Sequence, residues 1–239
     1  MQPLVSPGAG PIPGVPSQQP TNLFRFGEIT LYSTQLFKSG DILKNSISRL
    51  FATPLGAQGQ GYVSSLTKTE TNLKEGGRIP SGQAYDVYGV ATQVLGVSQS
   101  LSSDIAQDQP FNLGDAGVGN AQVAILQNIV NNGVLSWDFT QTVVDICPVM
   151  LAGAGGGLFG AIAQNGAGAN SGAMNNGNGG IWMYRKHPVA LPGNTTFAVL
   201  LQFGSRAQQI PEATSDYETG AAVRVVLLGY YKSVVEIGN

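Results

Sequence analysis

The sequence predicts an all-β protein built as an antiparallel β-sandwich. Two runs, Thr195–Phe203 and Ala222–Val235, carry Val, Leu, Phe or Tyr at most positions, which is typical of buried strands. Strands that are apolar on both faces need cover on both faces, from a second sheet or from a neighbouring subunit. The predicted strands do not alternate regularly with helices, so a parallel α/β sheet is not expected.

Six further segments have strand character, because they alternate apolar and polar residues or are rich in β-branched and aromatic residues. They are Leu23–Thr34, Tyr62–Leu73, Gln83–Val97, Val134–Phe139, Thr142–Leu151 and Ile181–Tyr184. About eight strands with long connections indicate a jelly roll, and two rolls would need about sixteen strands. The count favours a single roll, and a double roll stays open because short strands in glycine-rich segments escape detection.

Two short helices are expected among the strands. Segment Asp41–Ala52 places Leu43, Ile47, Leu50 and Phe51 on one helical face, with an aspartate that can cap its first turn. Segment Asn120–Asn131 shows a similar apolar spacing, begins at an asparagine and is followed by a glycine.

The chain divides into a proline-rich arm at residues 1–21 and a jelly-roll domain at residues 22–239. The arm holds six of the 13 prolines and no charged residue, which predicts an extended polyproline-like segment. Two interpretations stay open for it, a disordered tail or an arm that orders against a neighbour or an inner surface. Inside the domain, residues 152–180 hold eleven of the 33 glycines, which predicts a long flexible or closely packed insertion without helix.

The composition indicates a surface with few charges. Charged residues make up 11% of the chain and hydrophobic residues 42%, so the surface consists largely of uncharged polar residues. Such a surface suits burial against copies of the same chain, although a secreted bacterial β-protein can share this composition. The net charge of -2 and the scattered basic residues argue against a nucleic-acid-binding groove. Because no signal peptide or long apolar span is recognised, we expect a protein made in the cytoplasm.

Catalytic and metal-binding patterns are missing from the sequence. The single cysteine, Cys147, lies in an apolar run and is expected to be buried, and one cysteine with one histidine cannot complete a zinc site. His187, the only histidine, has no recognisable nucleophile partner, and Gly153–Gly157 lacks the Lys-Ser/Thr end of a phosphate-binding loop. The acidic residues do not form a calcium-loop pattern; they include Glu28, Glu70, Glu75, Glu212, Asp216 and Glu218.

Three aspartates within predicted strands, Asp86, Asp138 and Asp145, could form a carboxylate pair of the glycosidase type. The simpler interpretation places them on the exposed faces of half-buried strands. We therefore expect no enzyme activity, no catalytic, cofactor-binding or metal-binding residues, and no cofactor.

Four segments resemble parts of the jelly-roll major capsid proteins of small tailless icosahedral bacteriophages. They are Gly27–Leu43, Arg78–Val90, His187–Phe203 and Val223–Glu236, and the likeness covers about a quarter of the chain. It lies in a pattern: an I-P-x-G-Q entry to one strand, an L-P-x-N-x-x-F entry to the penultimate strand, and a glycine inside the last apolar strand.

The resemblance implies a viral structural protein that self-assembles through trimer or hexamer capsomers into an icosahedral shell. Its partners would be copies of itself, other virion proteins and a membrane beneath the shell, without sequence-specific nucleic-acid contact. Its location would be the virion, assembled in the host cytoplasm. An alternative is a carbohydrate-binding or adhesin-like β-sandwich, which predicts exposed aromatic residues on one face. The candidates for that role are Trp137, Trp182, Tyr184 and Tyr217. A cupin-type enzyme would need several histidines.

Overall fold

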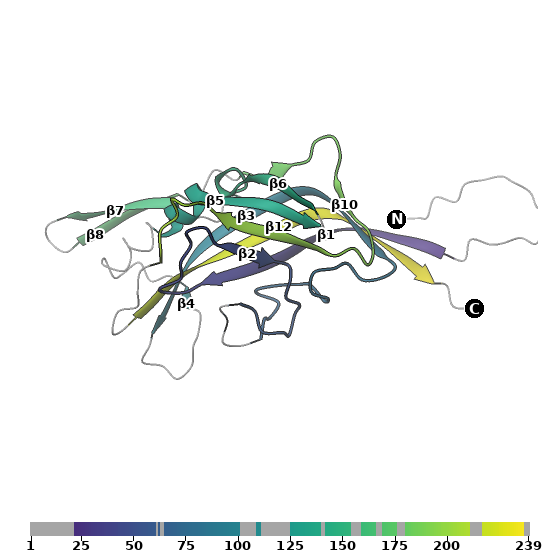
Figure 1. The fold of residues 1–239 in the computed structure, drawn as a ribbon, viewed down its shortest axis with the longest axis horizontal. Coiled ribbons are helices and arrows are strands. Elements are labelled where there is room, and N and C mark those ends of the chain that lie inside the picture. The colour runs from purple at the N-terminus through teal and green to yellow at the C-terminus, as the bar shows by residue number, and fades with distance from the viewer. Residues whose placement is uncertain are drawn as a thin grey trace, which may run out of the picture.

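The protein is a two-layer β-sandwich with little helix (Figure 1). The computed structural model describes residues 22–60, 62, 65–100, 109–110, 125–139, 142–153, 159–165, 169–175, 180–210 and 217–236. The predicted arm at residues 1–21 therefore lies outside the described residues. The predicted antiparallel sandwich is confirmed, because the two main sheets pair their strands in antiparallel fashion throughout.

The first layer, which we call the large sheet, is built from very long strands. In spatial order they are β1 (Asn22–Phe37), β12 (Tyr217–Glu236), β3 (Gln83–Ser100) and β10 (Val189–Leu191). Two short strands, β4 (Gln109–Pro110) and β9 (Trp182–Met183), also pair with β3. Strand β12 lies between β1 and β3, and its residues from Ala221 to Glu236 pair with the whole of β1.

The second layer, the small sheet, covers the middle of the large one. Its strands in spatial order are β2 (Ile47–Leu50), β11 (Phe197–Phe203), β5 (Gly133–Phe139) and β6 (Thr142–Pro148). A 3-10 turn, η1 (Val149–Leu151), follows β6, and residues 125–132 form a short helix before β5. Strands β7 (Phe159–Asn165) and β8 (Ala169–Asn175) form a separate hairpin.

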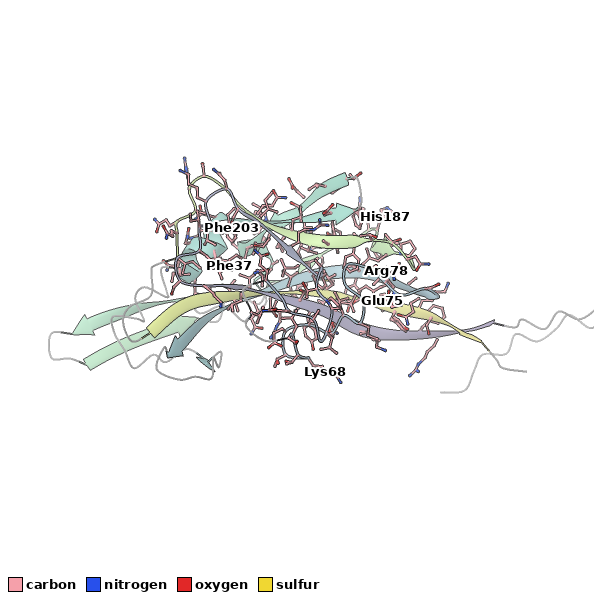
Figure 2. The ribbon with its side chains drawn as sticks, turned by 60° about the horizontal axis from the view of Figure 1, so that its bottom comes forward. Phe37, Lys68, Glu75, Arg78, His187 and Phe203 are labelled. Carbon is pink, nitrogen blue, oxygen red and sulfur yellow. The ribbon has the colours of Figure 1, made fainter. Side chains whose placement is uncertain are left out.

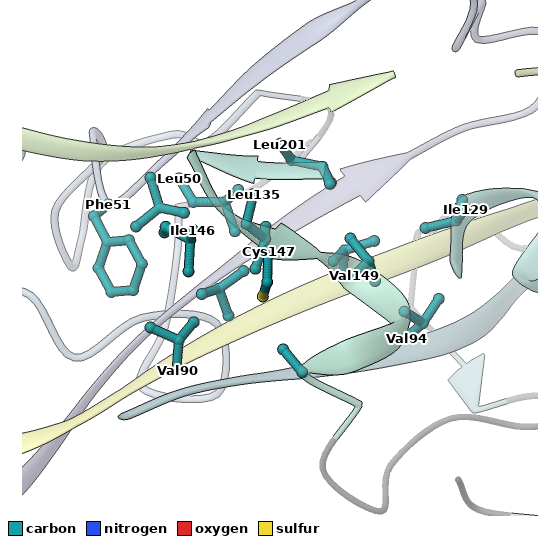
Figure 3. Close-up of a cluster of buried hydrophobic side chains, with 14 of the residues drawn as sticks. Leu50, Phe51, Val90, Val94, Ile129, Leu135, Ile146, Cys147, Val149 and Leu201 are labelled. Carbon is teal, nitrogen blue, oxygen red and sulfur yellow. The ribbon is translucent and has the colours of Figure 1, made fainter. Parts of the chain in front are cut away.

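The core lies between the two sheets (Figure 3). Strand β11 supplies Phe197, Val199 and Leu201, and β12 supplies Val223 and further inward-facing residues, all nearly inaccessible to solvent. Burying one such side chain contributes about 1.5–3 kcal/mol relative to leaving it exposed. The two C-terminal runs that the sequence marked as core strands therefore stabilise the molecule as predicted.

The predicted helix at Asp41–Ala52 is wrong, because this segment contains a turn and then strand β2. Asn45 and Phe51 have positive φ angles of 54° and 66°, which a helix does not allow. The backbone N–H of Phe51 donates to the Ser33 hydroxyl at 2.9 Å, and its ring packs on Phe197. Tertiary contacts thus override the helical spacing, and Ile47 is 60% exposed where the helix prediction buried it.

The predicted strand at Tyr62–Leu73 is also wrong, since side chains in this segment bond to the backbone: the Thr71 hydroxyl donates to the Tyr32 carbonyl at 3.2 Å. The N–H of Thr67 donates to the Glu70 carboxylate at 2.7 Å, which closes a turn. Asn72 takes the place of a partner strand beside β1: its side chain accepts from the Tyr32 N–H at 3.0 Å and donates to the Thr30 carbonyl at 2.7 Å. The segment is a loop that caps part of the edge of β1.

For the remaining segments, the predicted type of element is mostly correct, but the predicted bounds differ from the observed ones. Residues 125–132 are helical, with Ile125 and Ile129 buried, as predicted for Asn120–Asn131. The described residues of the glycine-rich insertion at 152–180 form no helix. They do include the β7–β8 hairpin, which the sequence did not predict because glycine is uncommon in strands. Strand β10 was missed because it has only three residues.

A β-bulge in the large sheet is fixed by one tyrosine and one glycine. The pairing shifts between Leu228 and Gly229, which leaves Tyr88 as the extra residue of β3. The buried Tyr85 ring lies over Gly229, and its hydroxyl donates to the Leu227 carbonyl at 2.8 Å and to the Ile29 carbonyl. A Cβ atom at residue 229 would lie 2.6 Å from both the Tyr85 ring and the Asp86 carbonyl.

We predict that Gly229→Ala destabilises the fold by about 1–3 kcal/mol, because neither the ring nor the carbonyl can move freely. Urea unfolding followed by circular dichroism would measure the loss. Gly27→Ala is the matched control, since a Cβ atom there meets nothing within 4 Å. Equal stability of the two variants would contradict this account of the bulge.

Candidate functional site

A groove opens where the large sheet extends beyond the small one. The first residues of β1 and the last residues of β12 continue past the rest of the sandwich (Figure 1). The groove has a volume of about 510 Å³ and lies between this extension and residues 72–83. Ile29, Leu31 and Tyr231 contribute apolar surface, and polar side chains surround it.

Three cationic side chains line the groove: Arg25 from β1, and Lys74 and Arg78 from the loop. Arg78 pairs with Glu75 at 2.7 Å, and Figure 2 labels the two residues in this loop. Neither Arg25 nor Lys74 has an ion-pair partner among the described residues. Aspartate and glutamate are absent from the described lining, so the groove is suited to an anionic group.

The side chains that line the groove are cationic, uncharged polar or apolar. Its described lining contains no histidine, cysteine or carboxylate that could act as a general base. Burial raises the pKa of Tyr85 well above its ordinary value, so this phenol stays protonated at neutral pH. Its hydroxyl is also engaged by two carbonyls, which leaves it a structural role.

A second exposed feature is an aromatic cluster on the outer face of the large sheet, made by Phe26, Tyr88 and Tyr230. The rings of Tyr88 and Tyr230 lie 5.1 Å apart, and Lys232 lies 5.8 Å from the centre of the Phe26 ring. Phe26 is 69% exposed and Tyr230 54% exposed. The hydroxyl of Tyr88 donates to the Glu28 carboxylate, and this hydrogen bond raises the pKa of Tyr88 to about 12.

We predict that Glu28→Gln lowers the pKa of Tyr88 from about 12 toward its ordinary value of 10.0, because the charged acceptor is removed. Ultraviolet titration of the tyrosines would detect one phenol ionising earlier, and Tyr88→Phe would remove that step. An unchanged titration curve in the glutamine variant would contradict the hydrogen bond.

The structure separates the sequence candidates for catalysis. His187 is exposed in the turn before β10 (Figure 2), whereas Cys147 is buried in the core. No group of three or more His, Cys, Asp or Glu side chains that could hold a metal ion occurs among the described residues. Of the glycine run Gly153–Gly157, only the first residue is described, and it forms a bridge with Thr92.

The three strand aspartates are divided between the two sheets. Asp138 is engaged by Arg49 at 2.8 Å, and Asp145 accepts a hydrogen bond from the Ser136 hydroxyl at 2.8 Å, both on the small sheet. Asp86 lies exposed on the large sheet. Asp86 and Asp145 are exposed, whereas the side chain of Asp138 is only 20% exposed beside Arg49.

The aromatic residues proposed as a sugar platform are largely internal. Trp137 is 2% exposed, and its indole N–H donates to the Tyr184 hydroxyl at 2.8 Å. Trp182 and Tyr184 pack against the core, and the side chain of Tyr217 lies outside the described residues. Sequence reasoning missed Phe26, Tyr88 and Tyr230, although Phe26 and Tyr230 follow the alternation of their strands.

Burial raises the pKa of the Cys147 thiol to about 11. We predict that a thiol reagent at neutral pH labels this cysteine slowly in the folded protein and rapidly after unfolding, since the thiolate is the reactive form. Stopped labelling followed by mass spectrometry would measure the two rates. Fast labelling of folded protein would contradict the buried position.

Comparisons with known proteins found no match to any family model, to any curated protein or to any solved structure. The likeness to phage capsid proteins therefore rests on the four sequence segments alone. In the described part of the chain, no helix has the length and apolar character needed to cross a membrane.

Proposed function

We propose that the chain is a viral structural protein, a major capsid protein whose copies assemble into an icosahedral shell. The observation that carries this proposal is the distribution of exposed apolar side chains, which gather in several separate places on the molecule. The strand order and the low charge support it further.

The strand order supports the jelly-roll part of the proposal. One sheet runs β1-β12-β3-β10 and the other β2-β11-β5-β6, so each sheet combines early and late strands of the chain. Eight antiparallel strands divided between two such sheets are the arrangement expected of one jelly roll. This order favours the single roll over the double one.

Exposed apolar residues occur at both edges of the small sheet. Val143 and Val144, on edge strand β6, are 55% and 48% exposed. Ile47, on the opposite edge strand β2, is 60% exposed, and Ile42 nearby is 66% exposed. Unprotected edge strands with apolar side chains favour association, and monomeric proteins usually guard them with charges.

The large sheet adds a further apolar surface on its outer face. Ile181 and Met183 lie over Gly89 and are 43% and 45% exposed, and the aromatic cluster lies on the same sheet. A subunit of a closed shell needs contacts of more than one kind, because each copy meets several neighbours. Several separate apolar surfaces suit that requirement better than a single ligand site does.

The low charge of the chain favours the same role. Charged residues make up only 11% of the sequence, and the buried cores of protein interfaces are likewise poor in charged residues. Large obligate interfaces between copies would bury this surface.

A carbohydrate-binding module remains the second candidate, and the aromatic cluster is the observation that favours it. Phe26 and Tyr230 offer exposed rings on one face, and the half-buried Tyr88 ring lies 5.1 Å from that of Tyr230. If this candidate is correct, Tyr230→Ala would abolish glycan binding. Shell formation by the same variant is a separate measurement.

Light scattering with negative-stain electron microscopy of purified protein tests the proposal. We expect trimers or hexamers that join into closed particles of uniform diameter. A protein that stays monomeric or dimeric under all conditions, alone or with extract from virions, would contradict it.

We also predict that Val143→Lys with Val144→Lys raises the protein concentration needed for assembly by about tenfold or more, because each buried valine contributes more than about 1 kcal/mol. Thr142→Lys, at a neighbouring exposed position, is the matched control. Circular dichroism would verify that all variants fold. If the double variant assembled at the same concentration as the wild type, the edge strand β6 would not be a contact between copies.

A further inference from the structure

We propose that the cationic groove of one copy binds the acidic segment at residues 211–218 of a second copy. The contact joins opposite ends of two molecules, head to tail. It rests on the proposed function in one respect, since it assumes that copies of the chain are neighbours in an assembly.

The groove has an unbalanced positive charge. Arg25, Lys74 and Arg78 are all exposed at its rim, and only Arg78 is matched by a carboxylate, that of Glu75. Two cations thus face the opening without an acidic partner among the described residues. Their charge favours an anionic ligand, and the attraction is weakened by salt.

The apolar surface inside the groove indicates a ligand that has apolar groups as well as negative charge. Ile29 is 43% exposed although it faces inward, and Leu31 and Tyr231 are only partly buried. A simple inorganic anion would leave this surface exposed to water, and a nucleic acid would need a longer basic track than three side chains. A short acidic peptide with an apolar or aromatic side chain fits both parts of the groove.

The chain itself contains such a peptide. Residues 211–218 read PEATSDYE and include Glu212, Asp216 and Glu218, the densest acidic stretch in a sequence with 14 acidic residues. The stretch contains no basic residue, and Tyr217 supplies an aromatic ring between two acids. Its charge is thus opposite to that of the groove.

The direction of β12 makes the contact intermolecular. This strand begins at Tyr217, beside the acidic segment, and reaches the groove at Tyr231. At about 3.3 Å per residue, the two points are roughly 46 Å apart on one straight strand. Tyr217, which directly follows Asp216 of the acidic segment in the sequence, therefore lies at the end of the strand opposite the groove of its own copy.

Because the two surfaces differ, the contact is heterologous and leaves a free groove and a free segment on each pair. Repetition of such a contact produces a ring if the rotation closes and an open filament if it does not. In a shell this contact would set how copies follow one another along the direction of their long strands.

A binding experiment with a labelled peptide tests the groove directly. A fluorescent peptide of residues 211–219 is titrated with the full-length protein, and its anisotropy is followed. We expect saturable binding that weakens as salt rises. Replacing the three acids (Glu212→Gln, Asp216→Asn, Glu218→Gln) in the peptide should weaken binding at least tenfold.

Variants of the protein locate the binding site. Arg25→Glu with Lys74→Glu should weaken peptide binding at least tenfold. Arg185→Glu with Lys186→Glu makes the same charge change in an exposed turn outside the groove and should leave binding unchanged. Equal binding by the groove variant and the wild type, or equal loss in both variants, would overturn the proposal.

A charge exchange in the full-length protein tests the contact between copies. Reversing the groove (Arg25→Glu, Lys74→Glu) or the segment (Glu212→Lys, Asp216→Lys) should each reduce association, and mixing the two variants should restore one heterologous contact per pair. Shells that form normally from the groove variant would overturn this inference and leave the proposed function standing. Peptide binding without shells under any condition would support the contact and contradict the shell.

Discussion

The pairing of β12 with its two neighbours is the constraint on which the rest of the structure depends. This 20-residue strand pairs with β1 from Ala221 to Glu236 and with β3 from Tyr217 to Ser233. Its inward side chains, Val223, Val225 and Leu227, are completely buried and form one wall of the core. Because the small sheet is shorter, this ladder also fixes what is left uncovered, namely the groove at one end and the aromatic cluster outside.

The proposed function and the cationic groove follow from the same mismatch in strand length. Most strands in globular proteins have about 5–6 residues, and β1, β3 and β12 each have 16 or more. The ends of β1 and β12 near the groove keep Ile29 and Tyr230 in contact with solvent. In our account, neighbouring copies cover these surfaces, and the separate apolar edges of the small sheet provide further contacts.

The strands of the core could be predicted from the sequence because their apolar runs are long and their burial is nearly complete. The spacing of apolar residues gave a wrong prediction where tertiary contacts determine the backbone conformation. Leu43, Leu50 and Phe51 have helical spacing, yet pairing of β2 with β11 and the positive φ of Phe51 place them in a strand and a turn. The groove could not be predicted, since Arg25, Lys74 and Tyr231 are far apart in sequence and only the overhang brings them together. The partners of two strand aspartates could not be predicted either, since Asp138 pairs with Arg49 across the small sheet and Asp145 accepts from Ser136 of the neighbouring strand.

Hydrogen exchange of assembled against dissociated protein tests most directly whether copies cover the exposed ends and edges. Our account predicts that amides at residues 22–29 and 142–145 exchange more slowly in the assembled state. Amides at residues 223–227, which are central in the large sheet, should exchange slowly in both states. Exchange at residues 22–29 and 142–145 that is equally fast in assembled and dissociated protein would contradict the claim that these surfaces are buried between copies.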